Sequence, residues 1–130
     1  MRVLGIDPGT AKCGYAVLDP DGALLALGIV PIAGLDAAIA GLVEQFAPGI
    51  AAVGRGTNAA AVGGAAQRHG LRVALVDEHE TTLRARARFF RDHPPRGWRR
   101  LIPRGMLLPD RPIDDYAAVL IAERFLRNPE

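Results

Sequence analysis

The sequence has little of what disulfides, thiolate metal clusters and membrane spans require. Cys13 is the only cysteine, so neither an internal disulfide nor a cluster of thiolate ligands can form within the chain. No apolar run approaches the roughly 20 residues that a membrane-spanning helix needs. These absences predict a cytoplasmic protein that is not inserted in a membrane.

Lysine is also almost absent, whereas arginine is abundant. Lys12 is the only lysine among the 16 Lys and Arg residues, and the formal net charge is only +2. Guanidinium groups suit two-point binding of phosphate, but an arginine-rich composition can also follow from genomic base composition. Arginine content alone therefore does not identify a ligand.

The distribution of the arginines is more informative than their number. Between Arg84 and Arg111 only Asp92 and Asp110 oppose them. The members of this basic segment are Arg84, Arg86, Arg88, Arg91, Arg96, Arg99, Arg100, Arg104 and Arg111. Such a run predicts salt-dependent binding of a polyanion. The alternative is a solvated helix face followed by a loop. Within the basic segment, Trp98 either stacks on an unpaired base or packs against the core.

Strand and helix signals alternate along the chain. With 130 residues, of which 49% are hydrophobic, we expect one domain spanning 1–130. The expected strands cover 3–7, 13–18, 23–30, 50–54 and 71–77, and the expected helices cover 35–46, 58–69, 81–91 and the region after Pro112. The first three strands form antiparallel hairpins, and the later strand–helix–strand units imply parallel right-handed crossovers. Proline and glycine predict a long loop over 92–110, which points to an α/β fold with a functional loop.

The first strand is expected to end in a carboxylate. Val3 to Ile6 are apolar or small, Asp7 follows, and Pro8-Gly9-Thr10 turns the chain into the second strand. A hairpin whose aspartate merely caps the turn would have the same pattern. The remaining carboxylates of the chain are therefore needed to choose between these two interpretations.

Three carboxylates are expected to converge at one edge of the sheet. Asp7 and Glu78 follow strands whose carboxyl ends form the usual ligand-binding edge of an α/β sheet, and Asp114 or Asp115 lies in the first turn of the last helix. Carboxylates in a first turn also complement the helix dipole, which is a purely structural reason for them. Carboxylates without histidine or cysteine partners favour Mg²⁺ or Mn²⁺, and two such ions can hold a phosphodiester and activate water. The pattern predicts phosphodiester hydrolysis.

Three motifs resemble one known family in order and spacing. They are Gly5-Ile6-Asp7-Pro8-Gly9-Thr10 with Gly14, then Val76-Asp77-Glu78 with Thr81-Thr82 and Ala85-Arg86, and finally Ile113-Asp114-Asp115-Tyr116-Ala117-Ala118-Val119. Together they are similar to the RuvC-like branch of the ribonuclease H-like superfamily, and within it to the small YqgF (RuvX) proteins. The resemblance covers nearly the whole chain.

The resemblance carries expectations about fold and chemistry. It implies a five-stranded mixed sheet of order 3-2-1-4-5 flanked by helices, with Asp7, Glu78 and Asp114 as catalytic residues and metal ligands. Asp115 is expected as an alternate ligand of the Mg²⁺ or Mn²⁺ ions, because neighbouring helix residues point about 100° apart and only one of the two can face the site directly. The implied activities are Holliday junction resolution and processing of the 5′ end of precursor 16S ribosomal RNA. Symmetric cutting of a junction would favour a homodimer.

The expected partner is therefore structured nucleic acid, either branched DNA or precursor rRNA. The residues expected to contact it are Thr10, Lys12, Arg55, Asn58, Arg84, Arg86, Arg99, Arg100 and Arg111. The chain departs from the family pattern at Gly54-Arg55-Gly56-Thr57-Asn58, at His79 and at Pro112.

Two other functions stay open from the sequence. One is a nucleic-acid-binding module without catalysis, which the departures favour. The other is an actin-like or sugar-kinase ATPase lobe, because Asp-x-Gly-Thr before a hairpin also forms a phosphate loop in those proteins. A second such loop, which they need in a second lobe, does not occur in this sequence.

Overall fold

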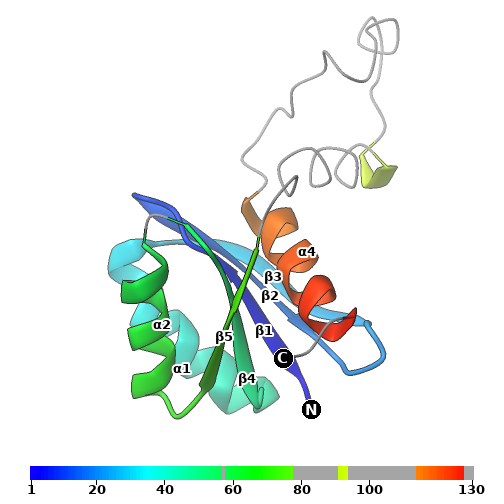
Figure 1. Ribbon diagram of the computed structural model, residues 1–130, viewed down its shortest axis with the longest axis horizontal. Coiled ribbons are helices and arrows are strands. Elements are labelled where there is room, and N and C mark those ends of the chain that lie inside the picture. Colours follow the sequence, from blue (N-terminus) through cyan, green and yellow to red (C-terminus); the bar gives the residue numbers. More distant parts are fainter. Residues whose placement is uncertain (57, 78–90, 94–113, 128–130) are drawn as a thin grey trace, which may run out of the picture.

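The computed structural model describes residues 1–56, 58–77, 91–93 and 114–127 (Figure 1). Its strands are β1 (Val3–Asp7), β2 (Lys12–Leu18), β3 (Leu24–Pro31), β4 (Ile50–Gly54) and β5 (Arg72–Val76), and its helices are η1 (Ile32–Gly34), α1 (Leu35–Phe46), α2 (Ala59–Arg68) and α4 (Asp114–Arg127). No helix within these ranges is long and apolar enough to cross a membrane.

The strands form one mixed sheet of order β3-β2-β1-β4-β5. β1 pairs antiparallel with β2, and β2 with β3, whereas β1–β4 and β4–β5 are parallel. Short hairpins can join only antiparallel neighbours, and the helical crossover α2 joins the parallel pair β4–β5. The predicted fold class and strand order are confirmed.

Strand alternation divides the sheet into two differently covered faces. Leu4 and Ile6 of β1 belong to the cluster packed by α1 and α2, while Val3 belongs to the cluster packed by α4. Figure 1 shows α1 and α2 on one side of the sheet and α4 on the other. Side chains of a strand point alternately to its two faces, so Gly5 and Asp7 follow Val3 to the α4 face.

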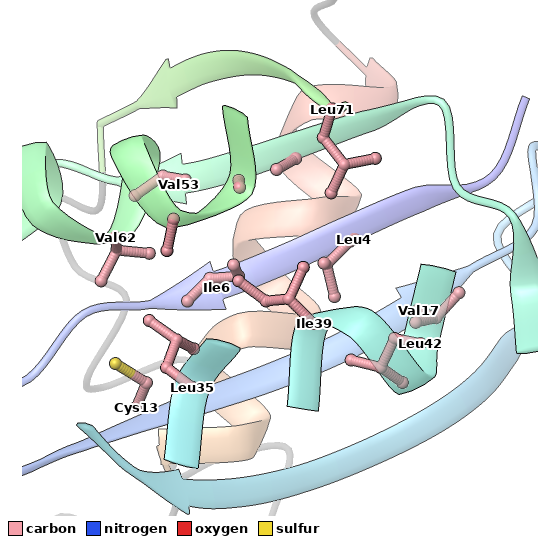
Figure 2. Packing of buried hydrophobic residues seen from close by; sticks show 13 residues of the cluster. Leu4, Ile6, Cys13, Val17, Leu35, Ile39, Leu42, Val53, Val62 and Leu71 are labelled. Atoms are coloured by element: carbon pink, nitrogen blue, oxygen red, sulfur yellow. The ribbon is translucent and has the colours of Figure 1, made fainter. Parts of the chain in front are cut away.

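The core on the α1/α2 face is aliphatic (Figure 2). α1 contributes Leu35, Ile39 and Leu42, whose spacing of three to four residues places them on one stripe facing Leu4 and Ile6. Each fully buried side chain of this size contributes about 1.5–3 kcal/mol. Hydrophobic burial therefore fixes α1 against the middle of the sheet.

α4 approaches the backbone of β1 more closely than a side chain would allow. A Cβ built on Gly5 would lie 2.8 Å from the Ala122 Cβ and would also collide with the Ala118 carbonyl oxygen. Val3, earlier on β1, packs in the same cluster as Phe125, which lies later on α4 than Ala118 and Ala122. Moving toward the end of β1 therefore means moving toward the start of α4, and the two elements run in opposite directions.

The expected element boundaries agree with the structure to within about one residue. α1, β1 and β4 have the predicted bounds, whereas β5 begins at Arg72 rather than residue 71. The reason is a local hydrogen bond, because the Leu71 N–H donates to the Ala66 carbonyl and so completes the end of α2. Gly70, at φ 84°, makes that reversal possible. Most of the expected 81–91 helix and 92–110 loop lies outside the described residues.

Candidate active site

Asp7 lies at the carboxyl end of β1, half-buried, with glycine on both neighbouring strands. It pairs with Gly14 of β2. On the other side Ile6 pairs with Val53, so the next residue of β4, Gly54, comes level with Asp7. Neither neighbouring strand places a Cβ beside this carboxylate. A ligand of Asp7 would therefore meet no side chain from β2 or β4 at this level.

The register between β1 and α4 brings the first turn of the helix to Asp7. Asp7 is two residues beyond Gly5, a rise of roughly 7 Å along the strand. An α-helix covers that length in four to five residues, which leads back from Ala118 to the beginning of α4 at Asp114. The partial positive charge of the helix N-terminus lies at the same end and favours carboxylates there.

Asp115 is built into this first turn. Only 5% of its surface is exposed, and its Oδ1 accepts the backbone N–H of Tyr116 at 2.9 Å. The N–H groups of a first turn have no partner within the helix, so this hydrogen bond satisfies one of them. Asp115 therefore has a structural role, whereas the side chain of Asp114 lies outside the description.

Glu78 also lies outside the described residues, which end here at Asp77. Ala74 and Val76 of β5 pack in the α4-side cluster, and Glu78 follows Val76 by two positions in the sequence. Among the residues that the structure describes, no three His, Cys, Asp or Glu side chains are grouped so that they could hold a metal ion. The three-carboxylate set remains a prediction, of which the structure places Asp7.

The loop after Asp7 is held by Asn58. Its Nδ2 donates to the Gly9 carbonyl at 2.6 Å. Asn58 directly precedes α2 and makes no side-chain cap bond there; the hydrogen bond from its Nδ2 joins the loop after β1 to the start of α2 instead. A Cβ on Gly9 would collide with the Lys12 carbonyl oxygen, so glycine is required in this tight turn. The sequence predicted a nucleic-acid contact for Asn58 and missed its role in fixing this loop.

The other predicted nucleic-acid contacts fall into two groups. Thr10 is exposed, and Lys12 is half-buried at the start of β2 on the same face as Gly14. Arg55 is exposed, and its N–H donates to the Val76 carbonyl at 2.9 Å, which places it at the ends of β4 and β5. The predicted contacts outside the described residues are Arg84, Arg86, Arg99, Arg100 and Arg111, together with Trp98.

The structure adds His93 to this neighbourhood. Its ring packs edge-on against Tyr116, with 6.3 Å between ring centroids and 80° between ring planes. Tyr116 follows Asp115 in the first turn of α4, so an exposed imidazole lies beside that turn. No sequence signal indicated this contact, because His93 and Tyr116 are far apart in the chain.

One electrostatic network lies away from this edge and joins α1 to α2. Hydrogen bonds from Arg68 and His69 lower the pKa of the exposed Asp36 carboxyl below its usual value of 3.8, with Arg68 the larger cause. The Arg68 Nη2 atom is 3.2 Å from both carboxylate oxygens. The network links the two helices that cover the face opposite Asp7.

The fold is similar to that of RuvC from Thermus thermophilus. A structure of that protein matches with a TM-score of 0.58 and 20% identity, over 99% of this chain and 97% of the other. A second, of RuvC in complex with a Holliday junction substrate, matches with a TM-score of 0.56 and 21% identity over the same shares. No protein-family model and no curated protein matches the sequence.

A weaker similarity extends to part of a sugar kinase. A ROK family glucokinase from Streptomyces griseus matches over 68% of this chain and 37% of its own, with a TM-score of 0.46. That score is too low to support a shared function. The RuvC comparison, by contrast, spans both chains and shows that this protein has the RuvC-type, ribonuclease H-like fold.

Proposed function

We propose that this protein is a divalent-metal-dependent nuclease that cuts structured nucleic acid, with Asp7, Glu78 and Asp114 as its catalytic carboxylates. The observation that carries the proposal is the position of Asp7. It ends the central strand, is flanked by Gly14 and Gly54, and faces the first turn of α4. The fold likeness to RuvC, which has been solved with a Holliday junction substrate, supports the choice of substrate class.

The residues at this edge fit a hard divalent ion. The proposed donors are carboxylate oxygens, which suit Mg²⁺ or Mn²⁺ rather than zinc. We assign Asp114 as the helix ligand from the resemblance of its motif to the RuvC-like family, while the Oδ1 atom of its neighbour Asp115 accepts the Tyr116 N–H. Asp115 remains an alternate ligand. When bound, such ions supply an activated water and neutralise charge on the phosphodiester.

The surrounding residues position the substrate. Asn58 fixes the Pro8-Gly9-Thr10 turn through the Gly9 carbonyl, and this turn presents Thr10 to solvent. Lys12 lies on the Asp7 face of β2 and supplies a positive charge near the carboxylates. These residues bind and orient a phosphate so that the bond to be cut lies above Asp7.

The decisive experiment compares cleavage by the wild type and Asp7→Asn. Labelled four-way DNA junctions and structured single-stranded RNA are incubated with Mg²⁺ or Mn²⁺ and with a chelator in parallel. Asp36→Asn is the matched control, because it makes the same chemical change on the opposite face of the sheet. We expect cleavage by the wild type and the control, and loss of at least 100-fold with Asp7→Asn or chelator.

The preferred substrate separates the two expected activities. Cleavage of the junction identifies a resolvase, which would act as a homodimer because two strands must be cut symmetrically. Cleavage of RNA alone identifies an rRNA-processing enzyme, which has no such requirement. Binding of both substrates without cleavage of either would refute the nuclease and leave a non-catalytic binding module.

A further inference from the structure

A small cavity with two arginines lies at the β5 edge of the sheet. It has a volume of about 110 Å³, well above the roughly 15 Å³ that holds one water molecule. Its lining comes from three separate parts of the chain: Arg55, Ala74, Leu75, Val76, Asp77, Arg124 and Phe125. The loop after β4, the second half of β5 and the last turns of α4 therefore meet at this point.

Each arginine is held in place through its backbone neighbours. The Arg55 N–H donates to the Val76 carbonyl at 2.9 Å, and Phe125, which follows Arg124, is buried in the α4-side core. Neither guanidinium forms an ion pair with any residue in the described ranges. Asp77 also lines the cavity, so the three ionised side chains carry a net positive charge.

The fold itself does not require the two cations at this position. Arg55 is exposed and Arg124 is half-exposed, and the apolar lining by Ala74, Val76 and Phe125 already closes the core beneath them. The neighbouring Leu75 leaves 45% of its surface exposed, which offers an apolar contact beside the charges. Paired cations beside an apolar surface match a nucleotide, which combines a phosphate with a sugar and base.

The cavity also lies at a suitable distance from Asp7. Gly54 is level with Asp7 and pairs with Val76, so two strand spacings, roughly 10 Å, separate Asp7 from the cavity wall. Successive nucleotides of one duplex strand rise by about 3.4 Å along the helix axis, and their phosphates lie farther apart than this rise, so the gap corresponds to about three nucleotides or fewer.

We infer that Arg55 and Arg124 form a phosphate-binding subsite for the nucleic-acid backbone, within about three nucleotides of the bond that is cut. The inference rests on the proposed function and adds to it a contact from the last helix. Arg124 lies in none of the three motifs that indicated nuclease chemistry. The subsite would hold the substrate strand on the β5 side of the carboxylates.

The test is the salt dependence of binding by Arg55→Ala/Arg124→Ala. Anisotropy of a labelled four-way junction is measured in chelator, to prevent cleavage, from about 50 to 200 mM salt. Each lost phosphate contact lowers the slope of log Kd against log salt concentration by about 0.9. If each arginine makes one such contact, the slope of the double variant should be lower than that of the wild type by almost two. Binding at low salt should weaken roughly tenfold or more.

The matched control is Arg72→Ala/Arg127→Ala. It removes the same charge from β5 and α4, at exposed positions outside the cavity lining. We expect its slope to change by less than about 0.5, since general charge is screened at these salt concentrations. Arg55→Lys/Arg124→Lys should restore most of the slope, and single Arg55→Ala should lose about half of it.

The outcomes separate this inference from the proposed function. Equal slopes for Arg55→Ala/Arg124→Ala and its control, with wild-type binding and cleavage intact, would overturn the subsite alone. A wild type that binds neither junction nor RNA would overturn the subsite and the proposed function together. A slope loss confined to Arg55→Ala/Arg124→Ala and reversed by lysine would establish the subsite.

Discussion

Replacing Gly5 by alanine tests whether the contact between β1 and α4 positions the site. The new Cβ would lie 2.8 Å from the Ala122 Cβ and would collide with the Ala118 carbonyl oxygen. Both atoms belong to a helix that packs on the sheet, so α4 must shift away. Overpacking of this kind typically costs 1–3 kcal/mol. Because α4 also carries Asp114, we expect Gly5→Ala to lower cleavage as well as stability.

Gly41→Ala is the matched control for this substitution. Gly41 is exposed in the middle of α1, and a Cβ there meets no atom within 4 Å. Glycine inside a helix costs about 0.5–1 kcal/mol relative to alanine, so Gly41→Ala should stabilise the protein by that amount. Glycine-to-alanine substitution is thus expected to lower the stability of the protein at Gly5 and to raise it at Gly41.

Urea denaturation measures both effects, and a double variant checks their cause. Combining Gly5→Ala with Ala122→Gly removes one of the two collisions, so the double variant should lose less stability than the sum of the single variants. Additive losses would show that the new methyl group does not meet Ala122. A destabilisation of Gly5→Ala below about 0.5 kcal/mol, or full cleavage activity despite it, would refute the close packing or its role in the site.

Three further predictions concern single positions. Asn58→Ala should lower the free energy of unfolding by about 1 kcal/mol and reduce cleavage, because the Gly9 carbonyl loses its donor. Unchanged cleavage would show that this hydrogen bond does not position the catalytic site. Ala47→Gly should stabilise the protein by about 0.5–1 kcal/mol in urea denaturation, because Ala47 ends α1 at φ 49°, where glycine is unstrained; a loss of stability would contradict this. Asp36→Asn should be less stable than wild type at pH 7, and the difference should shrink as the pH falls below 3.8, since the folded pKa of Asp36 is lowered and its stabilisation is lost on protonation. Thermal unfolding at pH 7 and pH 3 measures this difference, which would stay constant if Asp36 were not the titrating group.

Local sequence signals sufficed for most of the secondary structure. The stripe of Leu35, Ile39 and Leu42 and the Pro48-Gly49 stop defined α1, and the apolar run 50–54 defined β4. The ends that were misplaced by a residue, such as the start of β5, depend on hydrogen bonds like that between Leu71 and Ala66. Such bonds reflect backbone geometry, which residue preferences describe only approximately.

The candidate site was predictable in part. The motif around Asp7 indicated a carboxylate at the end of a buried strand, and the order of the three motifs indicated the RuvC-like fold. The role of Asn58 was missed, because an asparagine before a helix also suggests an ordinary cap. The contact of His93 with Tyr116 had no signal in either local sequence.

By itself the sequence determined which of the described segments become strands and helices, and that Asp7 ends the first strand. These properties follow from residue types and their spacing along a few turns of chain. Only the tertiary structure decided that Gly14 and Gly54 flank Asp7, that α4 packs against Gly5, and that Arg55 and Arg124 line one cavity. Each of these relations joins distant segments, so it depends on strand register and helix packing, which arise only when the hydrophobic core assembles.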